Sequence, residues 1–339
     1  MKYDFSKREE IIKAGDAMWI WAYLSRQYNL LDKRDFYHYT DINGFLGIIK
    51  NQEFWVSHIK YMNDSAEYTD GKNICERLLS NLIDSINTDE KELLLKAKSV
   101  LNIDKSLGFS PLSGKDVFSL SFTRDRDSLD MWRGYGNRSG IAIGFDIDAC
   151  FSLPGLCLVR KDQYDKDTKD KKSDEIFPQN KGALLLHNII YDNNLKETII
   201  SDVIDMGLEY YKTSNDKRST LEFLSDLLFA IFPYMKNEGF KNENECRFVD
   251  NISAISKSGE PLKIEYRERN GIILPFIKYK IVDLNCRPIV NWPIKEIVVG
   301  PGLRQKDLAE SIRYFLIKQG LEELSEKIVL SNITYISTM

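Results

Sequence analysis

The chain has 339 residues, of which 43% are hydrophobic and 12% aromatic, and its formal net charge at pH 7 is −4. This composition is ample for a large hydrophobic core in one large domain or two modest ones, and the acidic balance argues against a general basic surface for nucleic acid. No apolar run approaches the roughly 18 residues that are typical of a membrane-spanning helix, so we expect no membrane contact.

The cysteines and histidines are too few and too scattered for a metal or disulfide framework. The five cysteines are odd in number and never spaced as CxxC, which predicts neither a zinc site nor a set of disulfides. The chain has only three histidines, so we predict no metal cofactor. Because the first residues also lack the apolar core of a secretion signal, we expect a cytoplasmic protein with reduced thiols.

A predicted helix occupies most of residues 1–30. Ser6 and Glu9 form a capping-box pattern, and apolar residues follow at helical spacing, among them Trp19 and Trp21. We expect the aromatic side chains of this helix to pack on the body of the protein, which we predict to be a single domain over residues 31–339.

The stretch Phe36–Thr40 reads as a short strand that carries a histidine, two tyrosines and a threonine. Because side chains alternate along a strand, Tyr37 and Tyr39 face one way, and His38 and Thr40 face the other. A helix is predicted directly afterwards, over 41–51, and a helix N-terminus favours anions. We therefore expect this strand to form one wall of a nucleotide pocket.

The remaining elements alternate without the regular βαβ order of a parallel sheet, so we predict an α+β fold. Strands are expected over 54–57, 116–123, 140–146, 182–191, 243–249, 262–266, 272–281, 294–299 and 328–336. Helices are expected over 65–86, 88–100, 127–135, 195–212, 219–237 and 305–319, with Pro233 ending or kinking the fifth of these. We interpret the helical pairs near 65–100 and 195–237 as insertions around a central set of sheets, and the mixed-charge segment 161–181 as a solvated loop.

A second group of candidate site residues lies between residues 118 and 136. Ser121 and Thr123 are small hydroxyl residues on a predicted strand, which let a flat ligand approach and offer hydrogen bonds. Trp132 and Tyr135 are three residues apart and share a face of a helical turn, an arrangement suited to stacking on nicotinamide or a base, and Arg133 is a candidate for phosphate. The alternative is that these rings belong to the core and that the arginine pairs with a nearby aspartate.

The third group is Glu243-Asn244-Glu245-Cys246-Arg247. On a strand, Glu243, Glu245 and Arg247 project to the same side. Two carboxylates beside an arginine are costly to bury on an inward face, whereas on an outward face they are an ordinary solvated edge. The chain has no GxGxxG, P-loop, GxSxG or HExxH motif that would favour another chemistry.

Taken together, these motifs resemble a known family. The order is His38-Tyr39-Thr40, Phe54-Trp55-Val56-Ser57, Asn63-Asp64, Ser121-Phe122-Thr123, Met131-Trp132-Arg133-Gly134-Tyr135, the strand GIAIGFD and Glu243-x-Glu245-x-Arg247. Over about residues 36–299 this pattern is similar to the bacterial proteins grouped as domain of unknown function 2971, a family that is itself distantly similar to ADP-ribosyltransferases.

The resemblance to ADP-ribosyltransferases implies a fold and a ligand. Those enzymes bind NAD in a cleft between two small sheets and carry a three-part signature of a histidine or arginine, a tyrosine, serine or threonine, and a glutamate. Here His38 matches the first part, Ser121 or Thr123 with Tyr135 nearby the second, and Glu245 the third. The implied fold is a split β-sheet core with helical insertions, and the second part of the signature stays ambiguous.

The resemblance also implies roles for the residues. Glu245 would be the catalytic carboxylate, Glu243 would orient or deprotonate an acceptor, and Arg247 would pair with Glu245 or with phosphate. His38 would hold a ribose of NAD, next to Tyr39 and Thr40, while Trp132 or Tyr135 would stack on the nicotinamide and Arg133 would reach the pyrophosphate.

Several functions follow from this reading. The first is a glycosyltransferase that uses NAD to modify a protein or nucleic acid, as an intracellular toxin or anti-phage defence effector with an antitoxin or defence partner. The second is a NAD glycohydrolase, in which water is the acceptor. The third is a non-catalytic nucleotide-binding module. A nuclease is disfavoured by the acidic balance and by the lack of a metal-ligand cluster.

Overall fold

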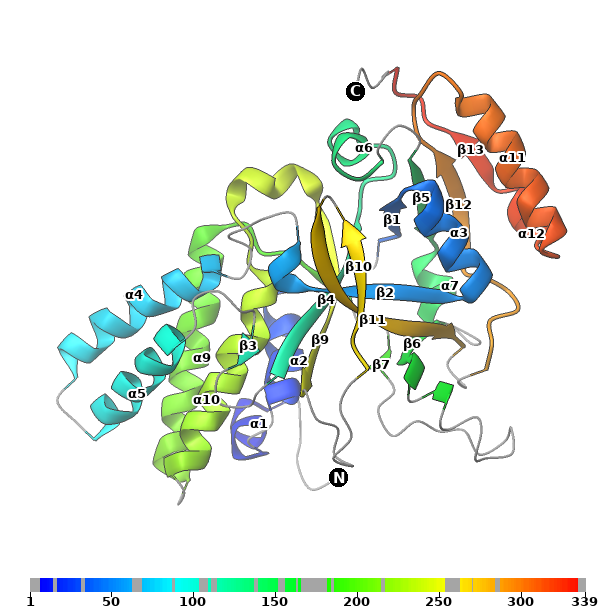
Figure 1. The fold of residues 1–339 in the computed structure, drawn as a ribbon. Helices are drawn as coiled ribbons and strands as arrows, with labels where there is room; N and C mark the ends of the chain where they lie inside the picture. The colour runs from blue at the N-terminus through cyan, green and yellow to red at the C-terminus, as the bar shows by residue number, and fades with distance from the viewer. Residues whose placement is uncertain are drawn as a thin grey trace.

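A mixed β-sheet runs through the centre of the protein, with helices gathered on either side (Figure 1). The computed structural model describes residues 7–14, 17–31, 34–62, 69–86, 89–103, 109–110, 115–136, 140–151, 156–162, 164–165, 182–183, 186–214, 217–253, 263–269, 271–283 and 287–334. The α+β class that the sequence predicts is confirmed.

The sheet is organised around strand β4 (Lys115–Thr123). One edge of β4 pairs along its whole length with β9 (Glu245–Ser253). The opposite edge is shared by two strands: β1 (Phe36–Thr40) meets it only at Thr123, and β2 (Glu53–His58) meets it only at Phe118 and Ser119. Between these contacts, residues 120–122 pair with neither strand, so the sheet splits there.

Each side of the split continues as its own set of strands. Beyond β1 lie β5 (Ile141–Phe145), β12 (Ile294–Val299) and β13 (Ile328–Leu330), and only the β12–β13 pair is parallel. Beyond β2 lie β11 (Ile272–Val282), β10 (Glu265–Arg269), β6 (Cys157–Arg160) and β7 (Gly182–Ala183). The short strands β3 (Phe109–Ser110) and β8 (His187–Asn188) pair with β4 and β9.

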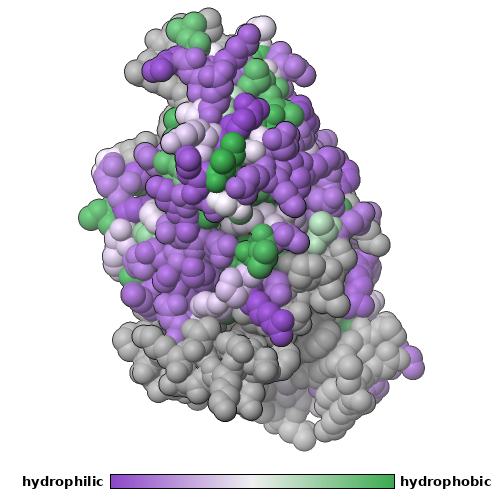
Figure 2. All heavy atoms as spheres, turned by 90° about the vertical axis from the view of Figure 1, so that its right-hand side faces the viewer, coloured by the Kyte–Doolittle hydropathy of each residue, from purple (hydrophilic) through white to green (hydrophobic). Residues whose placement is uncertain are grey.

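One hydrophobic core lies between the sheet and four helices that come from both halves of the chain. It joins rings of β1, β4 and β5, such as Phe36, Phe122 and Phe145, to apolar side chains of neighbouring helices. These helices are α3 (Ile42–Asn51), α7 (Ile147–Phe151), α11 (Gln305–Lys318) and α12 (Glu322–Ser325). The outer side of this region is mostly hydrophilic, with hydrophobic residues in small groups (Figure 2), as expected for amphipathic helices such as α11.

A second core belongs to a bundle of helices beside β4 and β9 (Figure 1). Its helices come from the N-terminus and from both predicted helical pairs: α1 (Arg8–Ala14), α2 (Ala17–Gln27), α4 (Thr69–Ser85), α5 (Glu90–Ile103), α9 (Asn193–Thr213) and α10 (Lys217–Ile231). The two helical pairs and the N-terminal helices therefore pack together as one group. No helix in the described ranges is long and apolar enough to cross a membrane.

Several predicted boundaries differ from the structure for local reasons. Helix α10 ends at Ile231, and Pro233 lies in the 3-10 helix η2 (Phe232–Tyr234), as the proline predicts. The strand expected over 243–249 begins only at Glu245, because Glu243 ends another 3-10 helix, η3 (Glu238–Glu243). The predicted turn at residues 63–64 and most of the charged segment 161–181 lie outside the described residues.

Candidate functional site

The split in the sheet opens into a cavity of about 620 Å³. Its walls come from β1, α3, β2, the middle of β4, the end of helix α6 (Leu129–Tyr135), η3, the start of β9 and the strand β10. His38, Ser121 and Glu245 all line it, so the three groups of residues singled out in the sequence converge on one place. A volume of this size lies within the range of small-molecule sites, which is roughly 300–1,000 Å³.

His38 reaches from β1 to the unpaired edge of β4. Its Nδ1 lies 3.1 Å from the carbonyl oxygen of Ser121, and because a carbonyl only accepts, we assign the proton of the neutral ring to Nδ1. Burial, with a smaller contribution from Arg267, lowers the pKa of His38 to about 4, against the opposing effect of the Ser121 hydrogen bond. At neutral pH the imidazole is therefore uncharged, with Nε2 as a hydrogen-bond acceptor.

Glu245 is the centre of a buried ion-pair network. Its carboxylate accepts hydrogen bonds from Nε of Arg247 at 2.5 Å, from Nη2 of Arg247 at 2.9 Å and from Nζ of Lys236 at 3.0 Å. Lys236 also donates to Glu243 at 2.6 Å. The exposed fractions are 5% for Glu245, 2% for Lys236 and 0% for Arg247, so the charges balance one another away from water.

The Glu245 carboxylate stays ionised in spite of its burial. Burial alone would raise its pKa, but the charges of Arg247 and Lys236 outweigh this effect and lower the pKa to about 2. The site thus holds an ionised carboxylate in a fixed position and an uncharged histidine in the wall of the same cavity.

Local backbone contacts explain why the sequence places Glu245 here. Asn244 takes the left-handed conformation, with φ of 44°, which turns the chain from η3 into β9. Its side chain donates to Asp125 at 2.9 Å, and Thr123 donates to the carbonyl oxygen of Glu243 at 2.7 Å. These bonds fix the turn against the end of β4.

Ser119 and Ser121 add buried hydroxyl groups to the cavity wall. The Ser121 hydroxyl faces the Glu245 carboxylate and contributes to its low pKa. The Ser119 hydroxyl meets no hydrogen-bond partner among the described residues. Buried polar groups are nearly always hydrogen-bonded, so the Ser119 hydroxyl is available to a ligand.

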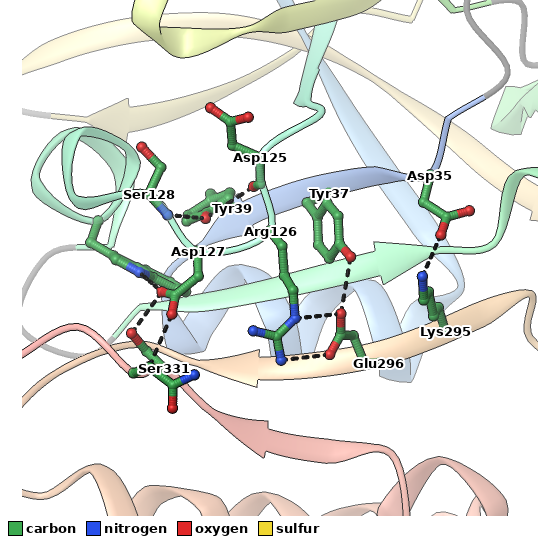
Figure 3. Close-up of polar contacts among 12 residues, drawn as sticks. Asp35, Tyr37, Tyr39, Asp125, Arg126, Asp127, Ser128, Lys295, Glu296 and Ser331 are labelled. Atoms are coloured by element: carbon green, nitrogen blue, oxygen red, sulfur yellow. Dashed lines mark hydrogen bonds and ion pairs between the residues drawn. The ribbon is translucent and has the colours of Figure 1, made fainter.

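Trp132 does not line the cavity, which corrects the stacking role predicted for it. Its ring is 2% exposed and packs on Tyr39 at a centroid distance of 4.4 Å. A Cβ atom on Gly300 would lie 2.8 Å from the ring, so the backbone is pressed against it. The indole Nε1 donates to Asp127 at 2.7 Å (Figure 3). Tyr135, three residues on, does line the cavity and remains the stacking candidate of the pair.

Tyr39 borders the cavity, but its hydroxyl holds the chain that leads into α6. The hydroxyl donates to the carbonyl oxygen of Asp125 at 3.2 Å and accepts from the backbone N–H of Ser128 at 3.1 Å (Figure 3). Nearby, Arg126 makes a two-pronged ion pair with Glu296, both bonds measuring 2.8 Å. These bonds hold the segment before α6 in position, so the hydroxyl of Tyr39 has a structural role.

Three further predicted ligand residues also lie outside the cavity lining. Arg133 is exposed on α6, and Thr123 is fully buried with its hydroxyl bonded to the backbone. Arg247 is fully buried behind Glu245 and donates to the carbonyl oxygen of Pro233 at 2.8 Å. The structure does not support phosphate binding by either arginine. Thr40 does line the cavity, as predicted.

Sequence reasoning missed several cavity residues. Lys236 follows the proline-ended helix in an irregular segment, where no periodicity predicts its direction. Trp55 and Arg267 were visible as members of predicted or adjoining strands, but their convergence depends on the pairing of β2 and β10 with β11. Among the described residues, no group of three or more His, Cys, Asp or Glu could hold a metal ion.

The comparisons with known proteins give one match. Residues 131–248 match the family described as "Protein of unknown function (DUF2971)". The matched segment includes Glu243, Glu245 and Arg247 but neither His38 nor Ser121. No curated protein and no solved structure matches the chain. Residues 131–248 of this chain therefore form a domain of the DUF2971 family.

Proposed function

We propose that the cavity binds NAD and cleaves its nicotinamide–ribose bond, with transfer of ADP-ribose to a protein or nucleic acid. The observation that carries the proposal is an ionised, rigidly held Glu245 in one cavity with an uncharged His38. A fixed negative charge in a buried site stabilises a developing positive charge more strongly than it would in water.

The chemistry needs few groups. When the bond between ribose C1′ and the pyridinium nitrogen breaks, its electron pair neutralises the nicotinamide and leaves an oxocarbenium-like centre on the ribose. Glu245 would stabilise this centre, as carboxylates do in glycoside cleavage. The acceptor then forms a bond to C1′ and loses a proton, for which Glu243 is the candidate base. Lys236 bonds both carboxylates and would hold them in register.

One observation favours a second candidate, a nucleotide-binding module without catalysis. Both oxygens of Glu245 already receive hydrogen bonds from Arg247 or Lys236, so the carboxylate also has a structural role that joins β9 to η2. A carboxylate that serves only this purpose would leave the ligand intact.

The experiment that separates these functions is incubation of the full chain with NAD labelled in its ADP-ribose part, with and without cell extract. Released nicotinamide together with label on a macromolecule indicates transfer. Released nicotinamide with free labelled ADP-ribose indicates the glycohydrolase variant. Binding of NAD without release of nicotinamide indicates the binding module, and the absence of both binding and release would contradict the proposal.

A further inference from the structure

Arg267 of β10 lies on the wall of the cavity and has no carboxylate partner among the described residues. Its Nη2 donates to the hydroxyl of Ser57 at 3.0 Å, and its Nε is buried with no hydrogen-bond partner in the described part of the chain. It makes no ion pair with any described residue. The side chain is half-buried, so the charge is partly removed from water without an opposite charge to compensate it, and an arginine in this state favours an anionic ligand.

The guanidinium group is held in place by two aromatic rings. It lies 5.5 Å from the ring centroid of Trp55 and 5.6 Å from that of Phe276. These rings stack on each other with a centroid distance of 4.5 Å and an interplanar angle of 22°. Because the rings and Ser57 fix the planar group, little conformational entropy is lost when it binds a ligand.

The charges around Arg267 leave its own charge uncompensated. Burial, and next the charge of Arg269, lower the pKa of Arg267, and only Asp41 acts in the opposite direction. The cavity carboxylates Glu243 and Glu245 are already neutralised by Lys236 and Arg247. Of the other carboxylates on the cavity wall, Glu53 is paired with Lys161 and Lys280, and Asp41 and Glu268 accept backbone N–H groups, so none of them forms an ion pair with Arg267.

We infer that Arg267 is the phosphate-binding residue of this cavity and that the ligand is a nucleotide, whose phosphate lies between Arg267 and the buried Ser119 hydroxyl of β4. Guanidinium pairs with phosphate through parallel hydrogen bonds, which is stronger and more specific than a single contact. The inference deepens the proposed function, on which it rests for NAD as the natural ligand, by assigning the phosphate subsite to Arg267 in place of Arg133.

The test is calorimetric titration of the full chain with three ligands. ADP contains both the base and the phosphates, inorganic pyrophosphate contains only the phosphates, and adenosine contains the base without phosphate. None of them has to be cleaved for binding to be measured. Arg267→Gln should weaken ADP and pyrophosphate binding by about ten- to hundredfold, the size of a charge-assisted contact, and adenosine binding by less than about twofold. Arg267→Lys should recover only part of the loss, since it restores the charge without the planar fork.

Lys278→Gln is the matched control. Lys278 lies over the same two rings, at 5.6 Å from Trp55 and 6.0 Å from Phe276, but it is paired with Glu265 and does not line the cavity. Its replacement should change ADP affinity by less than about twofold. Thermal unfolding of each variant checks that the fold is retained.

Three results would overturn the inference: no ADP binding by the wild type, equal binding of ADP and adenosine, or full ADP affinity in folded Arg267→Gln. A failure of the proposed function can be distinguished from a failure of this inference. ADP binding that depends on Arg267, together with intact NAD, would contradict cleavage and support the phosphate site. NAD cleavage with unchanged KM in Arg267→Gln would support cleavage and contradict the phosphate site.

Discussion

Glu245 shows how a buried charge is made tolerable by its neighbours. The pKa lies below the ordinary value of 4.5, at about 2, so the ionised form stabilises the folded state fully above about pH 4.5 and this stabilisation is lost as the pH falls to about 2. Breaking such a buried pair by removing one partner typically costs about 3–5 kcal/mol, because the other charge is left alone. Lys236 and Arg247 are therefore structural as well as electrostatic partners.

The first prediction concerns the protonation state of His38. Burial lowers its pKa to about 4, so its imidazole resonances should stay unchanged from pH 8 to pH 5 in an NMR titration, with assignment by comparison with His38→Gln. Since the unfolded histidine has a pKa of 6.5 and takes up a proton first, this residue should lower the unfolding free energy as the pH falls from 6.5 to about 4. A midpoint near 6.5 in the folded protein would show that His38 is not buried in this way.

Three residues singled out in the sequence line the cavity, each for a different reason. His38 was chosen as the histidine of an aromatic strand, Ser121 as a small hydroxyl residue on a strand, and Glu245 through the motif resemblance. The helical-face argument failed for Trp132, because α6 has only seven residues and Gly300 gives the indole ring a place in the core. Arg267 was missed because its burial depends on aromatic partners from other strands.

At the scale of elements, helix α3 presents two glycines, which have no side chains, to the cavity. Gly44 and Gly47 both line it and lie one turn apart. A Cβ atom on Gly44 would lie 2.0 Å from Oγ1 of Thr40, so any other residue there would force the Thr40 side chain to move. A Cβ atom on Gly47 meets nothing within 4 Å, which leaves room for a ligand. A glycine inside a helix costs about 1 kcal/mol relative to alanine, so its presence at position 47 calls for a reason such as this space.

The second prediction uses two substitutions at Gly47. Gly47→Ala should raise the unfolding free energy by about 0.5–1 kcal/mol and leave ADP binding nearly unchanged. Gly47→Trp should fill the cavity, so that ADP binding is lost while the far-ultraviolet circular dichroism and the melting transition stay close to those of the wild type. Calorimetry and thermal unfolding check both variants. Tight ADP binding by folded Gly47→Trp would mean that the ligand does not occupy this part of the cavity.

The element order and class were predictable because strands such as β1 and β5 show either clear alternation or a continuous apolar run. The unpaired stretch at residues 120–122 of β4 was not predicted from the sequence. It depends on which strands share the edge of β4, and periodicity carries no information on strand partners. The predicted strand over 243–249 began too early because Glu243 and Glu245 fit the alternation of a strand, although Glu243 is the last residue of η3.

At the scale of the whole molecule, Asp127 ties the C-terminal region to the cavity. Its carboxylate accepts from Nε1 of Trp132 at 2.7 Å, from the hydroxyl of Ser331 at 2.6 Å and from the backbone N–H of Asn332 at 2.9 Å (Figure 3). The contact joins the segment after β13 to α6, whose last turn lines the cavity. The end of the described chain thus supports the position of Tyr135.

The third prediction is that Asp127→Ala destabilises the protein by about 2 kcal/mol, because three donors to a charged acceptor lose their partner. Denaturant unfolding measures this change. Asp130→Ala, at an exposed position in the first turn of α6, is the control and should change the unfolding free energy by no more than about 0.5 kcal/mol. Equal stability of the two variants would argue that the C-terminal contact is not important for the fold.

The most direct test of the proposed activity is nicotinamide release from NAD by the wild type and by Glu245→Gln, which keeps the shape of the side chain and removes its charge. Turnover per folded molecule should fall by about a hundredfold or more, while KM changes by no more than about threefold, because the carboxylate acts mainly on the developing cation. Glu238→Gln, at an exposed position of η3, is the control for the substitution itself. Full cleavage by Glu245→Gln, or no cleavage by the wild type with any extract, would contradict the proposed catalysis.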